Sequence, residues 1–281
     1  MKVTFWGTRG SLATPGRDTL RYGGNTSCVQ ITGDEGSVLI LDAGTGIRNL
    51  SHALPQTLRR VDVLLTHLHM DHIQGLGFFS ALYNPEMEVH IWGPASTTMS
   101  LRARLVKYLS PPFFPVSLRD LPCKLRIHDS GHIDEDLMEF RVNTMQICHP
   151  GPTVGYRIKD SSGTLAYMPD HEPVLGAARF LPERDWISGM SVASGVDTLI
   201  HDSQYTDEEY KERIGWGHSS MKQAIEFARI AEVGHLVPFH YDPTHGDDEL
   251  EKMLNENIAA MSPCFPVTPA KEGDTLMVRR H

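Results

Sequence analysis

The sequence has few cysteines and no long hydrophobic run. Its four cysteines, Cys28, Cys123, Cys148 and Cys264, lie far apart and include no CxxC pair. This spacing excludes a disulfide framework and a zinc ribbon, and it is typical of a reducing cytoplasm. No apolar stretch approaches the roughly 18 residues of a membrane span. Residues 1–7 resemble a strand and not a signal peptide. We therefore expect a cytoplasmic protein with no membrane partner.

Positive charge is also scarce in this chain. There are 26 lysine and arginine residues against 35 acidic ones, which gives a net charge of −9. A large nucleic-acid footprint usually needs basic patches, so we expect none here. A small anionic substrate is not excluded, because bound dications would reverse the sign of the field locally. The 281 residues, 40% of them hydrophobic, suffice for one large domain or two small ones.

Histidine, in contrast, is concentrated at one point. Residues 66–72 read Thr-His-Leu-His-Met-Asp-His and follow an apolar run at 61–65 of the length expected for a buried strand. Imidazole and carboxylate groups are the ligands that zinc and similar metals prefer. A turning loop can point these side chains into one pocket. The alternative is a histidine-rich surface loop, but complementary ligands recur downstream at similar strand ends.

The stretch His67-x-His69-x-Asp71-His72 resembles the signature of the metallo-β-lactamase-fold hydrolases. The metal ligands of that family match, in the family's order, His67, His69, Asp71, His72, His149, Asp170 and His240. The resemblance implies an α/β fold, a four-layered αββα sandwich with a dinuclear metal site at one edge of the sheets. It also implies that residues 1–281 form a single domain.

The same resemblance implies how the ligands divide. One metal would be held by His67, His69 and His149, the other by Asp71, His72 and His240, with Asp170 as the bridge. Zinc is the expected metal and manganese is the alternative. Two such ions lower the pKa of a shared water and clamp a phosphoryl group. Asp71 would orient the resulting nucleophile. Lactam and thioester hydrolysis use the same chemistry.

A second stretch indicates which of these hydrolytic reactions to expect. Gly217-His218-Ser219-Ser220 resembles the Gly-His-Ser-Thr segment of the tRNase Z-like branch, whose histidine helps the leaving group. His201 and Asp202 lie where that branch carries a His-Glu pair that assists proton transfer, with aspartate replacing glutamate here. A leaving alkoxide needs a proton, which a histidine donates near neutral pH. Catalytic roles are therefore expected for His218, His201, Asp202 and Asp71. A plain loop histidine beside a helix N-cap is the alternative for His218.

The substrate class follows from what this chain omits. The tRNA-processing enzymes insert a long basic arm between the third histidine and the bridging aspartate, and His149 and Asp170 are too close for one. Residues 7–11 and 22–27 resemble small-phosphodiester hydrolases of the branch, which include enzymes that open cyclic nucleotides. We expect a phosphodiesterase on cyclic nucleotides or similar small diesters. The alternatives are a tRNase Z-like ribonuclease on RNA 3′ ends and a metal-bound nucleotide sensor without turnover.

Several supporting features are also expected. Tyr241, Phe113 and Phe114 are candidates for an apolar wall beside the base, and a homodimer is common in this branch. Asp42 either supports the metal-ligand loop or caps the helix after Gly46.

Periodicity predicts helices over 96–109, 181–193, 219–232 and 247–261, with Ser96 and Ser219 as N-caps of the first and third. The basic residues Arg102, Arg104 and Lys107 either face the substrate or line a solvated helix face, and His171 is given no role.

Overall fold

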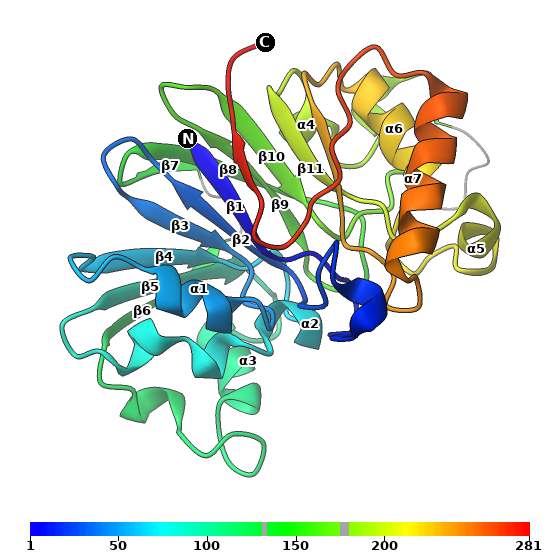
Figure 1. Ribbon diagram of the computed structural model, residues 1–281. Helices are drawn as coiled ribbons and strands as arrows, with labels where there is room; N and C mark the ends of the chain where they lie inside the picture. The colour runs from blue at the N-terminus through cyan, green and yellow to red at the C-terminus, as the bar shows by residue number, and fades with distance from the viewer. Residues whose placement is uncertain (131–133, 175–179) are drawn as a thin grey trace.

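Two β-sheets pack face to face, and helices cover their outer faces (Figure 1). The computed structural model describes residues 1–130, 134–174 and 180–281. One sheet has the strand order β13-β1-β2-β3-β4-β5-β6 and the other β12-β11-β10-β9-β8-β7. Helices α1 and α3 flank the first sheet, and α4, α6 and α7 flank the second. The predicted αββα sandwich is confirmed.

The strands of the first sheet are β1 (Lys2–Gly7), β2 (Cys28–Thr32), β3 (Val38–Leu41), β4 (Arg60–Leu64), β5 (Glu88–Pro94), β6 (Lys124–Ser130) and β13 (Thr275–Met277). Those of the second are β7 (Asp134–Leu137), β8 (Phe140–Gln146), β9 (Val154–Lys159), β10 (Thr164–Met168), β11 (Thr198–Asp202) and β12 (Leu236–Phe239). The helices are α1 (Ile47–Ala53), α2 (Met70–Ile73), α3 (Leu101–Tyr108), α4 (Met190–Ala193), α5 (Asp207–Glu212), α6 (Met221–Ile230) and α7 (Asp247–Met261).

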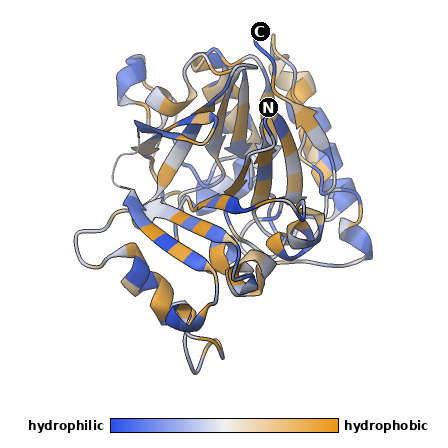
Figure 2. Ribbon diagram, turned by 90° about the vertical axis from the view of Figure 1, so that its left-hand side faces the viewer, coloured by the Kyte–Doolittle hydropathy of each residue, from blue (hydrophilic) through white to orange (hydrophobic). Residues whose placement is uncertain are grey.

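The core forms in layers because successive strand residues point to opposite faces. In β3, Leu39 and Leu41 belong to the apolar cluster between the sheets, while Val38 and Ile40 pack under the helices that cover the first sheet. A strand buried on both faces reads as a continuous apolar run, which is the pattern of this segment. Figure 2 shows the central strands largely in hydrophobic colours, whereas the outer helices alternate between hydrophobic and hydrophilic colours.

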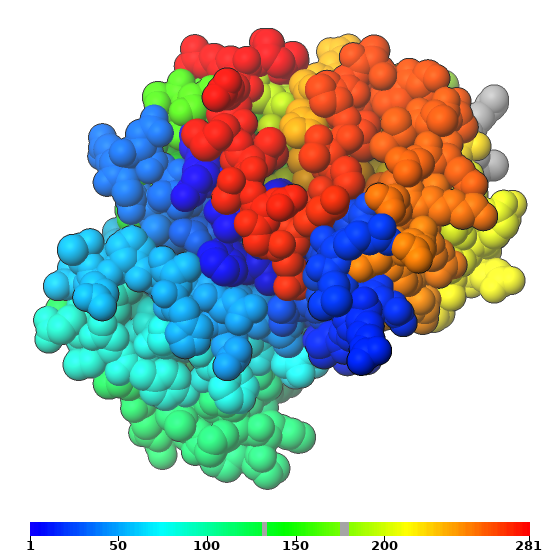
Figure 3. All heavy atoms as spheres, in the orientation of Figure 1, coloured from blue at the N-terminus to red at the C-terminus, as the bar shows by residue number. Residues whose placement is uncertain are grey.

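The chain ends lie close to each other on one side of the sandwich. β13 pairs antiparallel with β1, with Val3 opposite Leu276. In Figure 3 the last residues run across the surface between the first strand and α7. This pairing covers one edge of the first sheet, which would otherwise expose unpaired backbone groups. Among the described residues, none of the helices has the length and apolar character needed to cross a membrane.

Helix positions differ from the predictions in three places. The predicted start at Ser96 is wrong: Ser100 caps α3 by accepting the N–H of Ala103, and Ser96 bonds Thr98 instead. Residues 181–193 are helical in α4 only at Met190–Ala193, with a short 3₁₀ turn at Arg184–Trp186.

The N-cap of α6 is also one residue later than predicted. Ser220, not Ser219, makes a capping box with Gln223, in which each side chain bonds the other's backbone N–H. Ser219 instead donates its hydroxyl to the carbonyl of His171. α7 spans the predicted residues, with three acids in its first turn, where the helix dipole favours negative charge.

Candidate metal centre

Histidines and aspartates converge where strands of both sheets end. β10, β11 and β12 are parallel neighbours, so their carboxyl ends meet at one edge, the usual place for a ligand site in such sheets. Asp170 follows β10, Asp202 ends β11 and His240 follows β12. The loop between β4 and α2 supplies His67 and His69 from the other sheet, and α2 itself supplies Asp71 and His72. Tertiary packing of the two sheets therefore assembles one cluster from five chain segments.

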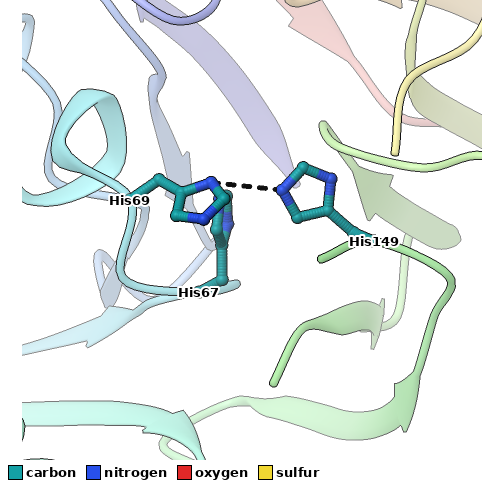
Figure 4. A group of neighbouring side chains, drawn as sticks. All are labelled: His67, His69 and His149. Carbon is teal, nitrogen blue, oxygen red and sulfur yellow. Dashed lines mark hydrogen bonds between the residues drawn. The ribbon is translucent and has the colours of Figure 1, made fainter. Parts of the chain in front are cut away.

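Three histidines form the first group within this cluster. His69 Nδ1 lies 3.2 Å from His149 Nε2, the pair joined by the dashed line in Figure 4. The ring of His67 lies 4.5 Å from that of His69 and 4.7 Å from that of His149. One ligand nitrogen from each lies within 4.8 Å of the others, the spacing of ligands around a single ion. These are the three residues expected to hold the first metal.

The second group comprises Asp71, His72, Asp170 and His240, all buried. Asp71 Oδ2 lies 3.2 Å from Nε2 of both His72 and His240. Asp170 Oδ1 lies 3.0 Å from His72 Nε2 and 3.3 Å from His240 Nε2. Four ligand atoms therefore converge on one small volume, and they are the set expected for the second metal plus the bridging carboxylate.

Asp170 lies between the two groups. Its Oδ1 faces His72 and His240, whereas its Oδ2 lies 3.7 Å from His67 Nε2 and 3.8 Å from His149 Nε2. One oxygen thus faces each group, which is the placement that a bridging carboxylate requires. Two buried atoms here, His67 Nε2 and Asp170 Oδ1, have no hydrogen-bond partner. Buried polar atoms are rarely left unpaired, so these two atoms fit a bound cation.

Three of the five ligand histidines are oriented by a hydrogen bond to their other ring nitrogen. His72 Nδ1–H donates to Asp42 (2.8 Å), and His149 Nδ1–H donates to the carbonyl of Gly217 (2.9 Å). His240 Nδ1–H donates to Gln204 Oε1 at 2.9 Å. Such bonds fix the tautomer, so that Nε2 presents its lone pair to the cluster. The histidines are arranged as metal ligands and not as a proton-sharing network.

Asp42 therefore supports the metal-ligand loop, one of the two roles that its position suggested. It accepts hydrogen bonds from the Thr66 N–H (2.7 Å) and hydroxyl, and from the Tyr167 hydroxyl (3.0 Å). Helix α1 begins after Gly46 without a side-chain cap, so capping by Asp42 is not observed. Asp42 adopts a left-handed backbone, with φ of 58°, and His240 does the same at 62°. Such conformations are uncommon outside glycine and concentrate at functional sites.

The protonation states suit a divalent metal. Burial lowers the pKa values of His67, His69 and His149, so these rings are neutral and offer lone pairs. Burial alone would raise the pKa of Asp170, but His240, His72 and His67 hold it well below its usual range. The Asp170 carboxylate is thus ionised, and the three imidazoles of the first group are neutral. A neutral imidazole and an ionised carboxylate are the forms that bind metal.

His218 borders both groups and is paired with Asp202. Its Nδ1 lies 2.7 Å from Asp202 Oδ2 and 3.8 Å from Asp170 Oδ2, and the residue is only 8% exposed. Burial lowers the pKa of His218, but the ion pair and hydrogen bond with Asp202 outweigh burial and raise it to about 9. Asp202 is itself held by the backbone N–H groups of Gln204 and Ser219. The pair places a protonated imidazole at the edge of the ligand cluster.

His201 does not join this cluster. Residues 201 and 202 are consecutive in β11, so their side chains point to opposite faces. The His201 ring packs against Phe227 and its Nε2 lies 2.9 Å from His171 Nδ1, while Asp202 faces His218. The side chain that pairs with Asp202 is therefore His218 and not His201, which forms a buried pair with His171. A catalytic role for His201 stays a prediction.

Glu172 is a site residue that the sequence did not single out. Its fully buried carboxylate accepts hydrogen bonds from the Tyr210 hydroxyl (2.8 Å) and the Gly217 N–H (2.9 Å). The carbonyl of the same Gly217 orients His149. The available signal was its position two residues after Asp170, in the loop that follows β10.

The other sequence candidates are paired elsewhere, buried in the core or exposed. Arg104 bonds the carbonyl of Pro94 and lies 3.8 Å from Asp129, while Arg102 and Lys107 are exposed on α3. Tyr241 is fully buried against Tyr22, so it cannot offer a face to a base. Phe114 is buried in the apolar cluster under the first sheet. Phe113 is exposed (77%), so among the three residues proposed as an apolar wall it is the one with an accessible ring.

Comparison with known proteins agrees with this geometry. The chain is 28% identical to a ribonuclease Z of Gemmatimonas aurantiaca over 88% of this chain and 87% of the relative. Among solved structures it superposes on the short form of human tRNase Z, with a TM-score of 0.68, 18% identity and 99% of each chain covered. It also superposes on Zn²⁺-bound PqqB from Methylobacterium extorquens, with a TM-score of 0.68, 19% identity and coverage of 99% and 100%. The family model of the beta-lactamase superfamily domain matches residues 38–241, and the chain belongs to this superfamily of metal-dependent hydrolases.

Proposed function

We propose that this protein is a dinuclear metal-dependent phosphodiesterase. The observation that carries the proposal is the His218–Asp202 pair, 2.7 Å apart, beside a ligand cluster in which Asp170 faces two groups. The thiolate of a thioester leaves without a proton donor, whereas the alkoxide of a phosphodiester needs one. The protonated imidazole therefore supports phosphodiester hydrolysis over thioester hydrolysis.

Each residue then has a defined task. Dications bound by the two groups would supply hydroxide at neutral pH and stabilise charge on the phosphoryl oxygens. Asp71, whose Oδ2 accepts the Ser11 N–H at 2.8 Å, orients the attacking oxygen. His218 is bonded to Asp202 through Nδ1, so its Nε2–H remains to protonate the leaving oxygen. Asp202 fixes the ring and favours its charged form. Zinc is the proposed metal, with manganese as the alternative.

For the substrate, the comparisons favour RNA 3′ ends over cyclic nucleotides. The matched relative is named ribonuclease Z and one matched structure is a tRNase Z. On this reading the chain would trim or cut RNA, with the scissile phosphate at the ligand cluster and His218 protonating the leaving ribose oxygen. The net charge of −9 limits how many RNA phosphates it could contact.

A small cyclic or short diester is the second candidate, and one structural observation favours it. The segment between His149 and Asp170 consists of β9 and β10, which pair directly as an antiparallel hairpin. It contains no room for the long basic arm expected of tRNA-processing enzymes. A single cyclic nucleotide needs one phosphate at the cluster and few further contacts. A homodimer of single-domain chains stays a prediction under either reading.

One experiment separates these readings. Purified protein loaded with zinc or manganese is given 3′,5′-cyclic nucleotides, linear diesters and a 3′-extended tRNA at matched ionic strength. Efficient cutting of the tRNA with negligible turnover of cyclic nucleotides would establish the ribonuclease, and the reverse would establish the small-diester enzyme. Activity on neither class, with metal bound, would refute the phosphodiesterase proposal itself.

A parallel variant tests the role of His218. His218→Ala should keep its metal content and lose roughly 10²- to 10⁴-fold in turnover, the usual worth of a general acid. The loss should shrink for a p-nitrophenolate leaving group, which hardly needs a proton. If good and poor leaving groups suffered equally, His218 would be a binding or structural residue.

A further inference from the structure

An exposed tryptophan sits on a tightly held turn next to the catalytic histidine. Trp216 is 59% exposed, and Gly217, directly before His218, follows it. The carbonyl of Gly217 accepts a hydrogen bond from His149, so the backbone beside Trp216 touches the first ligand group. Consecutive Cα atoms are about 3.8 Å apart, so the backbone of Trp216 lies one residue from this contact.

The turn is held by a single buried carboxylate. Glu172 accepts the N–H of Gly215 at 3.0 Å and that of Gly217 at 2.9 Å, one on each side of Trp216. Both glycines have a φ of 88°, a conformation that other residues rarely adopt. A β-carbon at Gly217 would lie 2.2 Å from His149 Nδ1. The backbone carrying Trp216 is thus fixed relative to the ligand cluster.

The start of the turn is anchored to the same site. The Trp216 N–H donates to the Arg213 carbonyl at 3.0 Å. The Arg213 guanidinium lies 5.0 Å from the centre of the Tyr205 ring, and that ring lies 5.7 Å edge-on from His218. Trp216 is thus a large aromatic side chain that is exposed on a rigid support beside the ligand cluster, and its ring is available to a bound ligand.

We propose that Trp216 is a stacking platform for the nucleobase next to the scissile phosphate. The proposal rests on the phosphodiesterase function and adds to it a base-binding subsite. Every nucleobase has a flat face that stacks on an aromatic ring, so this contact selects nucleotides over base-free diesters without selecting one base. The same contact serves a cyclic nucleotide or the end of an RNA strand.

The test compares Trp216→Ala and Trp216→Phe with Trp186→Ala. Trp186 is a second exposed tryptophan (78%) with no contact to the ligand cluster among the described residues, and it serves as the matched control. Substrates are 3′,5′-cyclic AMP, a short oligoribonucleotide, and trimethylene phosphate, a cyclic diester without a base. The base-bearing substrate whose KM rises in Trp216→Ala shows whether the base belongs to a cyclic nucleotide or to an RNA strand.

Trp216→Ala should raise KM for the base-bearing substrate roughly 5- to 150-fold, the worth of one base–aromatic stack, with kcat little changed. Trp216→Phe should restore most of the affinity, and Trp186→Ala should not alter KM. Hydrolysis of trimethylene phosphate should be unchanged in all three. Binding of AMP should quench the tryptophan fluorescence of the parent protein, and Trp216→Phe should lose that quench.

Three results would refute the proposal that Trp216 stacks on a nucleobase. They are an unchanged KM in Trp216→Ala, an equal loss on trimethylene phosphate, and an equal effect of Trp186→Ala. A shift from dimer to monomer in Trp216→Ala would likewise assign the residue to a contact between copies. Should the parent protein hydrolyse none of these diesters, the phosphodiesterase proposal fails by itself. Fluorescence titration with AMP against ribose 5-phosphate would then still decide whether Trp216 binds a base.

Discussion

Replacing Asp202 with asparagine should destabilise the metal-free protein in a pH-dependent way. The ion pair with Asp202 raises the pKa of His218 to about 9 from an ordinary value of 6.5. A difference of about 2.5 units at about 1.4 kcal/mol each corresponds to about 3 kcal/mol of stability from this pair. His218 is only 8% exposed, so solvent screening removes little of it.

The direction with pH follows from the raised pKa. A histidine with a higher pKa in the folded state stabilises the protein fully below its unfolded pKa, near 6.5, and loses that contribution as pH rises through about 9. Asp202→Asn should therefore lower the free energy of unfolding by about 3 kcal/mol more near pH 5.5 than near pH 10. Urea unfolding of chelator-treated protein at the two pH values measures the difference.

The control separates charge from backbone support. Asp202 also accepts the N–H groups of Gln204 and Ser219, and loss of those bonds does not depend on pH. In a His218→Ala background, Asp202→Asn should therefore lower the free energy of unfolding by the same amount at both pH values. An equal loss at both pH values in the parent protein would show that the pair carries no charge, and the proposed proton donor would be refuted.

Three further outcomes are expected. Elemental analysis of loaded protein should find two metals per chain, because the seven ligands exceed what one tetrahedral ion can use; one metal or none would contradict the dinuclear centre. Asp170→Ala should disturb both metals, and retention of two metals with full activity would show that Asp170 does not bridge. Asp42→Asn should weaken metal affinity by roughly 10- to 100-fold, measured by chelator competition, because it loosens His72 from behind. Gln30→Ala, at a buried position of β2 outside the centre, is its control.

The sequence by itself determined most of the ligand set. His67, His69, Asp71 and His72 are local: a strand, a turn and a short helix place them together whatever the rest of the chain does. The apolar run at 61–65 also located β4, because a strand buried on both faces shows as an apolar run. The same pattern did not predict β7, because its sequence Asp-Glu-Asp-Leu carries three exposed acids at the edge of a sheet.

Only the tertiary structure decided which groups cooperate. His201 and Asp202 are neighbours in sequence, yet strand alternation sends one toward Phe227 and the other toward His218, sixteen residues away. Glu172 has no motif around it, and its role became visible once Gly215 and Gly217 folded back onto it. Motifs record short-range geometry, whereas hydrogen bonds between distant segments depend on how the two sheets pack. The ligands could therefore be predicted from the sequence. Of the groups that orient them, Asp42 was a candidate in the sequence, whereas Gln204 and the carbonyl of Gly217 were not.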